Sequence, residues 1–217
     1  MNEAVIFDMD GVIFDSEQVV RMGWNDAAQK LGLEDIDTLY FQCIGRNLRN
    51  TEEKLCKHFG PQFSYGEFSR LTRNFFRDYI NQKGLPVKCG ARELLTYLSW
   101  QNGHIGMASS SGLPYIRAEL QQAGLIKYFS VIVSGDNLEH SKPEPDIYLN
   151  ACMEMGVTPS ETYAIEDSYS GILSASRAGM KPIMVPDLQP PTAEMRRLCT
   201  VICEDLRMVQ TYFERNC

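Results

Sequence analysis

Residues 4–17 read AVIFDMDGVIFDSE, an apolar run that leads directly into two acids and a glycine. The run Ala4–Phe7 predicts a buried strand. Because side chains at positions i and i+2 of a strand point to the same side, we expect Asp8 and Asp10 to lie together, where their charges repel. Such a pair is stable only if a positive group lies between the two acids or if one of them holds a proton. The stretch therefore indicates a site of chemistry at the end of a buried strand.

Further strand-like runs follow along the chain, and most are separated from the next by a stretch with helical periodicity. The predicted strands are Ala4–Phe7, Ile105–Ala108, Val131–Val133, Tyr163–Ile165, Pro182–Val185 and Val201–Cys203. The predicted helices are residues 91–101, 113–123, 146–155, 171–178 and 206–214. Strands and helices that alternate in short units are typical of a mostly parallel sheet covered on both faces. We therefore predict an α/β fold with a Rossmann-like core.

One long segment interrupts this alternation. From residue 16 to residue 85 the sequence carries only helical signals. Val20, Trp24 and Ala27 begin an apolar stripe at helical spacing, and Ser64 with Glu67 predicts a capping box. The segment is too long for a crossover connection between two strands. We therefore expect two domains, a Rossmann-like core of residues 1–15 and 86–217 and an inserted helical domain of residues 16–85.

The composition disfavours several classes of protein. The chain has 21 Lys+Arg against 28 Asp+Glu, a formal charge of −7, which argues against nucleic acid or an acidic membrane surface as a partner. No apolar run approaches the roughly 20 residues that span a bilayer, and no basic leader precedes the first strand. Seven scattered cysteines without a C-x-x-C spacing argue against a disulfide framework and a structural zinc site. We expect a cytoplasmic monomer with reduced thiols, although no pattern determines the oligomeric state.

Polar side chains gather where the predicted strands end, which is where open α/β sheets bind ligands. Two acids follow the first strand, and a serine-rich turn follows the second. A lysine lies in the loop after the third strand, and two more acids follow the fourth. These residues are Asp8, Asp10, Ser109, Ser110, Ser111, Lys142, Glu166 and Asp167. Carboxylate oxygens suit Mg²⁺, whereas a lysine, a hydroxyl and N–H groups at a helix N-terminus suit an anion. A metal site, an anion site and two acids at one strand together indicate phosphoryl transfer.

The expected positions of the acids suggest their roles. Asp8, at the strand end, would attack phosphorus and form an aspartyl-phosphate. Asp10 would protonate the leaving oxygen and later deprotonate a water molecule, and its main-chain carbonyl would approach the metal because Gly11 permits a sharp turn. Asp167 would be the second carboxylate ligand of the metal, with Glu166 in the outer shell.

The donors would surround the transferred phosphoryl group. Ser109 and Lys142 would hold its equatorial oxygens, and Ser110 and Ser111 would lie beside it at the helix N-terminus. Singly, each feature has an ordinary structural explanation, such as a helix N-cap, a solvated lysine or an acid that complements a helix dipole. Because all of them fall at strand ends of one predicted sheet, together they favour a catalytic site.

Four stretches resemble the four signature motifs of the haloacid dehalogenase (HAD) superfamily. They are DMDGV at residues 8–12, MASSS at 107–111, SKPEPDIY at 141–148 and IEDSYSG at 165–171. The helical insert between the first two motifs is similar to the small cap domain of one subgroup, which includes β-phosphoglucomutase and sugar-phosphate phosphatases. The resemblance covers essentially the whole chain. It implies a Mg²⁺-dependent phosphatase or phosphomutase whose cap closes over a small phosphorylated metabolite.

Three functional hypotheses remain open. The related mutase uses a histidine on the first cap helix, and counting without gaps from Asp8 places Val20 there, which cannot relay a proton. The favoured hypothesis is therefore a phosphatase acting on a small metabolite such as a sugar phosphate. The second is a sugar phosphomutase. The third is a catalytically silent binding module, which would be expected to lack at least one of Asp8, Asp10, Lys142 and Asp167.

Residues of the inserted domain would select the substrate. The loop IGRNLRN at residues 44–50 is the leading candidate, because a glycine permits an unusual turn and an arginine could reach a second anionic or hydroxyl-rich group. Its candidate residues are Gly45, Arg46, Asn47 and Arg49. A further row of Arg70, Arg73 and Arg77 is predicted to be a solvated cationic helix face.

Overall fold

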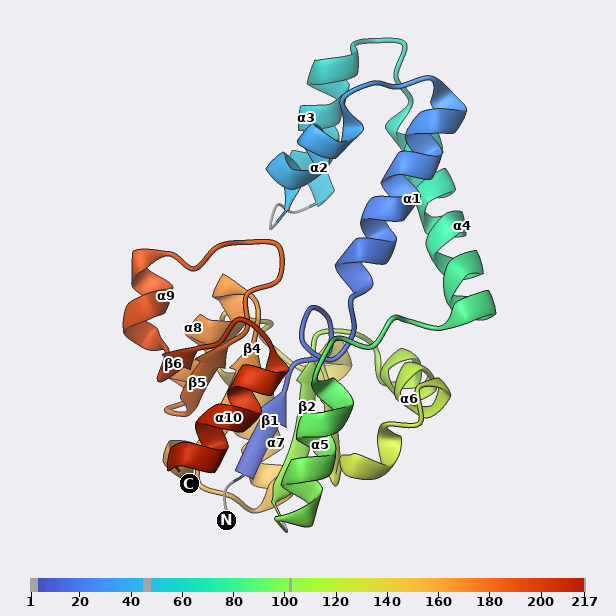
Figure 1. Ribbon diagram of the computed structural model, residues 1–217. Helices are drawn as coiled ribbons and strands as arrows, with labels where there is room; N and C mark the ends of the chain where they lie inside the picture. The colour runs from blue at the N-terminus through green and yellow to red at the C-terminus, as the bar shows by residue number, and fades with distance from the viewer. Residues whose placement is uncertain (1–3, 45–47, 102, 217) are drawn as a thin grey trace. The chain divides into compact units, whose positions relative to one another are not determined.

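The computed structural model describes residues 4–44, 48–101 and 103–216. The chain forms two compact units (Figure 1). The first, which we call the core unit, comprises Met1–Asp15 and Pro86–Cys217. The second, which we call the cap unit, comprises Ser16–Leu85.

The core unit is built on a six-stranded parallel sheet in the order β3-β2-β1-β4-β5-β6. Its strands are β1 (Ala4–Phe7), β2 (His104–Ser109), β3 (Val131–Ser134), β4 (Thr162–Glu166), β5 (Lys181–Met184) and β6 (Val201–Ile202). This is the doubly wound order of a Rossmann-like sheet, in which the chain moves outward from β1 in both directions. The prediction of an α/β fold with a Rossmann-like core is confirmed.

Helices cover both faces of this sheet, with α5 and α10 in front of it and α7 behind it in Figure 1. The helices of the core unit are α5 (Ala91–Trp100), α6 (Leu113–Gln122), α7 (Asp146–Met155), α8 (Tyr169–Arg177), α9 (Ala193–Leu198) and α10 (Leu206–Asn216). Short 3₁₀ turns at Ile126–Tyr128, Gly135–Asn137 and Pro159–Glu161 complete the core unit.

The central strands are buried on both sides, which explains why they read as apolar runs rather than as alternating patterns. Ile6 of β1 and Ala164 of β4 pack with Tyr148 and Ala151 of α7. Tyr163, the residue before Ala164 in β4, points to the opposite face, where the centre of its ring lies 5.1 Å from that of Phe213 in α10. The sheet thus forms a rigid centre, and the ends of its strands are well placed to carry functional side chains.

The described residues of the cap unit form four helices. They are α1 (Ser16–Leu31), α2 (Ile36–Cys43), α3 (Leu48–Phe59) and α4 (Tyr65–Lys83). The side chain of Ser64 caps α4 by accepting a hydrogen bond from the Glu67 N–H (3.3 Å), as the sequence pattern predicts. Trp24 of α1 packs edge-on against the rings of Tyr40 in α2 and Phe68 in α4. Among the described residues of both units, no helix is long and apolar enough to cross a membrane.

Candidate active site

Three neighbouring strands end side by side in the middle of the sheet. Strand β1 lies between β2 and β4, and all three run in the same direction. Asp8 therefore follows β1 between Ser109, the last residue of β2, and Glu166, the last residue of β4. The N–H of Asp8 donates to the main-chain oxygen of Ile165 (3.0 Å), so this residue is held against β4 although β1 itself ends at Phe7.

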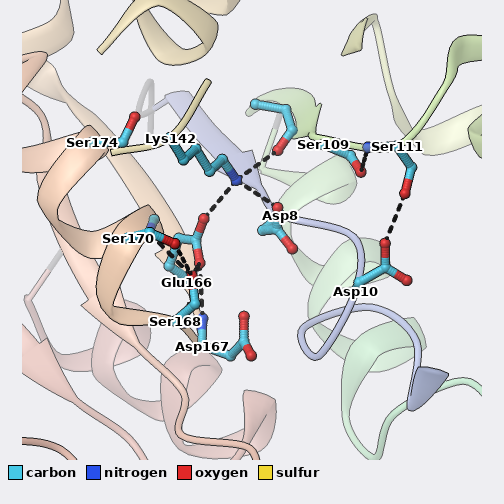
Figure 2. A network of polar contacts seen from close by, with 12 residues as sticks. Asp8, Asp10, Ser109, Ser111, Lys142, Glu166, Asp167, Ser168, Ser170 and Ser174 are labelled. Carbon is cyan, nitrogen blue, oxygen red and sulfur yellow. Dashed lines mark hydrogen bonds and ion pairs between the residues drawn. The ribbon is translucent and has the colours of Figure 1, made fainter. Parts of the chain in front are cut away.

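Lys142 supplies the positive group at this strand end (Figure 2). Its Nζ donates to Asp8 Oδ1 (2.6 Å), to Glu166 Oε1 (2.6 Å) and to the main-chain oxygen of Ala108 (3.2 Å). The lysine side chain is only 8% exposed. All three ammonium protons thus have acceptors inside the protein, and Lys142 joins the ends of three strands.

Glu166 is fully buried, and both of its carboxylate oxygens are occupied. Oε1 accepts from Lys142 and from the Tyr148 hydroxyl (2.8 Å). Oε2 accepts from the Asp167 N–H (3.1 Å), the Ser168 N–H (3.3 Å) and the Ser168 hydroxyl (3.1 Å). Because few lone pairs remain for another partner, the geometry favours Glu166 as a group that orients its neighbours.

Asp167 presents its carboxylate to the same space without a hydrogen-bond donor on its side chain, within the part of the chain that the structure describes (Figure 2). Oxygens of Asp8, Glu166 and Asp167 lie within 4.8 Å of one another. Gly11, at φ +80°, passes so close that a Cβ there would lie 2.4 Å from Asp167 Oδ2. This all-oxygen donor set beside a glycine turn fits a hard divalent cation.

Asp10 is turned toward β2 rather than toward Lys142 (Figure 2). Its Oδ2 accepts from the Ser111 hydroxyl (3.0 Å), and the Ser111 N–H donates to Ser109 Oγ (3.1 Å). Ser110, between them, is exposed. Of the two acids that follow β1, Lys142 therefore contacts only Asp8, and the Ser111 hydroxyl holds Asp10. The two side chains separate because β1 ends at Phe7, before the chain reaches Asp10.

Burial and mutual repulsion raise the pKa values of two carboxyl groups in the cluster formed by Asp8, Glu166 and Asp167. Burial raises the pKa of Asp8 to about 7; the Lys142 charge opposes this shift and the Glu166 charge adds to it. Burial, followed by the charges of Glu166 and Asp8, also raises the pKa of Asp167 well above its ordinary value. Burial by itself lowers the pKa of Lys142, but the charges of Asp8 and Glu166 raise it well above its ordinary value. One lysine thus does not neutralise the cluster, which is a second reason why it fits a cation.

Three further residues of the site lie inside the motifs but are not singled out by the sequence analysis. Tyr148, the last residue of SKPEPDIY, is fully buried and donates to Glu166. Ser168 caps α8 by accepting from the Gly171 N–H (3.1 Å) while it donates to Glu166. A Cβ on Gly171 would lie 1.9 Å from the Glu166 carboxyl carbon, so only glycine fits. Their motif positions are the only signal that could have identified them.

An ion pair next to the cluster gives no sequence signal at all. Lys88 Nζ lies 2.6 Å from Asp187 Oδ1, on the loop after β5, and the Lys88 N–H donates to the main-chain oxygen of Ile13 (2.9 Å). Asp187 Oδ2 is buried and has no hydrogen-bond partner among the described residues. Its charge contributes to the raised pKa of Asp167. The pair therefore extends the charged network of the site to the loop after β5.

The candidate residues of the cap unit are only partly covered. Gly45, Arg46 and Asn47 lie outside the described residues. Arg49 forms an exposed pair with Glu53 (3.1 Å) on α3, an arrangement with little energetic weight.

The row of arginines on α4 is exposed. Arg70 and Arg77 form exposed pairs with Glu67 (3.8 Å) and Asp78 (3.5 Å), as expected for a solvated face. Arg73 is exposed as well, as the prediction requires, and it also borders a pocket inside the cap unit.

The fold and the site define a Rossmann-like α/β protein with a candidate carboxylate nucleophile and a cluster of oxygen donors that fits a metal ion. A family model described as "Haloacid dehalogenase-like hydrolase" matches residues 5–185. Beta-phosphoglucomutase of Bacillus subtilis is 32% identical over 195 residues, 87% of this chain and 85% of that protein. The phosphorylated carbohydrates phosphatase of Thermotoga maritima is 29% identical over 181 residues, 83% of each chain. A crystal structure of a HAD family hydrolase from Deinococcus radiodurans has a TM-score of 0.82 at 22% identity, covering 99% of this chain and 96% of that one.

The chain belongs to the haloacid dehalogenase-like hydrolases, in the β-phosphoglucomutase-like group. It is an enzyme of the phosphoric monoester hydrolase class.

Proposed function

We propose that this enzyme is a Mg²⁺-dependent phosphatase that hydrolyses a sugar phosphate through an aspartyl-phosphate on Asp8. The observation that carries the proposal is the placement of Asp8 at the centre of the sheet, in contact with Lys142 and within reach of Asp167. A nucleophile, a cation and a metal-binding carboxylate are the parts that phosphoryl transfer requires.

The residues that would hold Mg²⁺ are Asp8, Asp167 and the main-chain carbonyl of Asp10, with Glu166 orienting the neighbouring main chain. Glu166 fits the orienting role because its two oxygens already accept five hydrogen bonds. When bound, Mg²⁺ would neutralise the crowded carboxylates and polarise a phosphoryl oxygen. It would also lower the raised pKa of Asp8, so that the nucleophile is ionised at neutral pH.

In the first step, a carboxylate oxygen of Asp8 attacks phosphorus, and the bond between phosphorus and the ester oxygen breaks. Asp10 gives its proton to the departing alcohol. Ser109 accepts from Ser111 and keeps its own hydroxyl proton for a phosphoryl oxygen. Lys142 holds Asp8 in place and stabilises the negative charge that develops on the phosphoryl group in the transition state.

In the second step, a water molecule attacks phosphorus and gives a proton to Asp10, and the bond between phosphorus and Asp8 breaks. The products are inorganic phosphate, the free Asp8 carboxylate and Asp10 in its original protonated form. The hydrogen bond from Ser111 keeps Asp10 on the side of β2 in both steps.

Hydrolysis is favoured over isomerisation by the identity of residue 20. The relatives include both a phosphomutase and a phosphatase whose names specify phosphorylated carbohydrates, and this supports a sugar phosphate as the substrate. Val20 lies in α1, where the related mutase carries a histidine. A valine cannot donate or accept a hydrogen bond, so it cannot assist a second phosphoryl transfer.

Phosphate release from a panel of phosphate esters, with Mg²⁺ and with EDTA, tests the proposal. β-Glucose 1-phosphate is included and assayed in parallel for glucose 6-phosphate. Metal-dependent release from sugar phosphates is expected. Isomerised product without free phosphate would instead identify a mutase, despite Val20.

The nucleophile is tested separately with Asp8→Asn. This variant is expected to remain folded and to lose turnover, because an amide cannot form the aspartyl-phosphate. Lys142→Arg, which retains the cation, is the matched comparison and is expected to lose less activity than Asp8→Asn. Full activity in Asp8→Asn would refute the covalent route.

A further inference from the structure

Lys142 lies in a tight turn that helix α8 holds from one side. Within the turn, the N–H of Glu144 donates to the main-chain oxygen of Ser141 (3.0 Å). The main-chain oxygen of Glu144 accepts from the Ser174 hydroxyl of α8 (2.6 Å), and Figure 2 labels Ser174 beside Lys142. Ser174 is fully buried, so water cannot replace its hydroxyl as the donor. The first contact between α8 and the lysine loop is therefore a buried hydrogen bond to the main chain.

Arg177, further along α8, makes a second contact with the same loop. Its Nη1 donates to the main-chain oxygen of Pro143 (3.2 Å) and to Glu144 Oε1 (2.6 Å). The Arg177 and Glu144 side chains are 42% and 48% exposed, and an exposed ion pair by itself contributes little. The bond to Pro143, however, adds a fixed point on the main chain. The two residues that follow Lys142 are thus both held through their main-chain oxygens.

One face of α8 makes these contacts and also meets Glu166. Gly171, Ser174 and Arg177 follow one another at intervals of three residues, so they lie along one face of the helix. At the start of this face, the Glu166 carboxyl group occupies the space that a Cβ on Gly171 would take. The same helix face therefore contacts both the acid that accepts from Lys142 and the loop that carries this lysine.

The helix that provides this face is fixed in the core unit. Ser168 caps its N-terminus. Ile172 packs with Met184 of β5, and Ala175 belongs to the same buried cluster as Ile147 of α7. Because α8 is anchored to the sheet and to a neighbouring helix, its side chains form a rigid support for the loop.

The ammonium group of Lys142 depends on such a support. Its Nζ lies 2.6 Å from both Asp8 Oδ1 and Glu166 Oε1, at the end of a long flexible stem. These contacts last only if the main chain at the base of the stem stays in place, since a displacement of about 1 Å is enough to disrupt a reacting geometry.

We infer that Ser174 and Arg177 are positioning residues for Lys142. They act through the main chain that follows the lysine rather than on the phosphoryl group itself. By holding that main chain, they keep the ammonium group between Asp8 and Glu166. The effect on turnover rests on the proposed function, in which Lys142 stabilises charge on the phosphoryl group, whereas the effect on stability does not.

Ser174→Ala tests the buried contact through turnover. It removes only a hydroxyl group and should lower kcat and kcat/KM together by at least about fivefold, because a displaced Lys142 stabilises the transition state less. Thr162→Val is the matched control. Thr162 is fully buried as well, and its hydroxyl donates to the main-chain oxygen of Thr158 (2.8 Å), but at the opposite end of β4 from Glu166. This control should lower Tm to a similar extent and leave kcat within about twofold of the unmodified enzyme.

Arg177 provides a second, independent variant. Arg177→Met removes the donor to both acceptors of the loop and should lower kcat at least about twofold. Arg177→Lys keeps a charged donor for the same acceptors and should retain most of the activity. If Ser174→Ala fails to fold, equal kcat values in Arg177→Met and the unmodified enzyme would overturn the inference.

A double-mutant cycle in EDTA tests the positioning role without turnover. Tm is measured for Ser174→Ala, for Lys142→Met and for the double variant. Because Ser174 is inferred to act through Lys142, the loss of Tm caused by Ser174→Ala should be at least about 2 °C smaller once the lysine is gone. The same cycle with Thr162→Val should be additive. Equal losses from Ser174→Ala in both backgrounds would overturn the inference, and if Lys142→Met fails to fold, the turnover comparison with Thr162→Val decides.

The two tests also separate this inference from the proposed function. If the unmodified enzyme releases phosphate from no ester, the phosphatase is refuted and the cycle alone decides the role of Ser174. Metal-dependent phosphate release, together with a kcat in Ser174→Ala no lower than in Thr162→Val, would support the phosphatase and overturn the positioning role.

Discussion

Replacing Lys142 by methionine tests the electrostatics of the site most directly. The substitution keeps a long apolar side chain but removes the ammonium group from between Asp8 and Glu166, each 2.6 Å from Nζ. The two carboxylate side chains are 11% and 1% exposed, so water cannot replace the lost partner. Removing one partner of a buried ion pair lowers the free energy of unfolding by about 3–5 kcal/mol. For a domain of this size, that corresponds to roughly 6–20 °C in Tm.

The loss should depend on pH, and its direction follows from the raised pKa of Asp8. With Lys142 in place this pKa is already about 7, and without the lysine it rises further because a compensating charge is gone. Above this pKa Asp8 is ionised and the whole penalty applies. As the pH falls below it, Asp8 takes up a proton and the penalty shrinks.

Thermal unfolding in EDTA at pH 8 and at pH 5.5, followed by circular dichroism, measures both effects. Arg207→Met is a matched control in the same unit, since Arg207 forms an exposed pair with Glu93 at 3.8 Å and should contribute less than about 1 kcal/mol. The reasoning fails if Lys142→Met is no less stable than the control at pH 8, or if its loss of Tm is the same at both pH values.

Two other substitutions probe the same cluster. In the folded protein, burial and the charges of Glu166 and Asp8 raise the pKa of Asp167, so its ionised carboxylate destabilises the fold at pH 8. Because Asp167→Asn removes this carboxylate, the variant should melt several degrees above the unmodified protein at pH 8 in EDTA. It should also lose the rise in Tm on addition of Mg²⁺, and a lower Tm in EDTA would contradict this account. Gly171→Ala places a Cβ 1.9 Å from the Glu166 carboxyl carbon and should lower both Tm and phosphate release, whereas Gly66→Ala, with no atom within 4 Å of the new Cβ, should leave Tm unchanged or raise it. Calorimetry and the phosphate assay measure these effects, and equal behaviour of the two alanine variants would show that the contact with Glu166 is unimportant.

The amino-acid sequence determined the elements of the fold and the positions at which chemistry could occur. Apolar runs such as Ala4–Phe7 and Tyr163–Ile165 predict strands because burial on both faces requires apolar residues at every position. The helices between them follow from their periodicity, and the capping serine at position 64 follows from side-chain chemistry close in sequence. Since parallel strands all end at one edge, Asp8, Ser109 and Glu166 could be expected near one another before their distances were known.

The tertiary structure decided which of these side chains touch. Lys142 lies 134 residues from Asp8 and 24 from Glu166 in the chain, yet contacts both, while Asp10, two residues from Asp8, is held instead by Ser111. No local pattern encodes such pairings, because they depend on how loops from separate strands pack. The same holds for the raised pKa of Asp8 and for the burial of Glu166, which carries no hydrophobic signal in the sequence. Burial and contacts between residues far apart in the chain set both properties, and these exist only once the chain has folded.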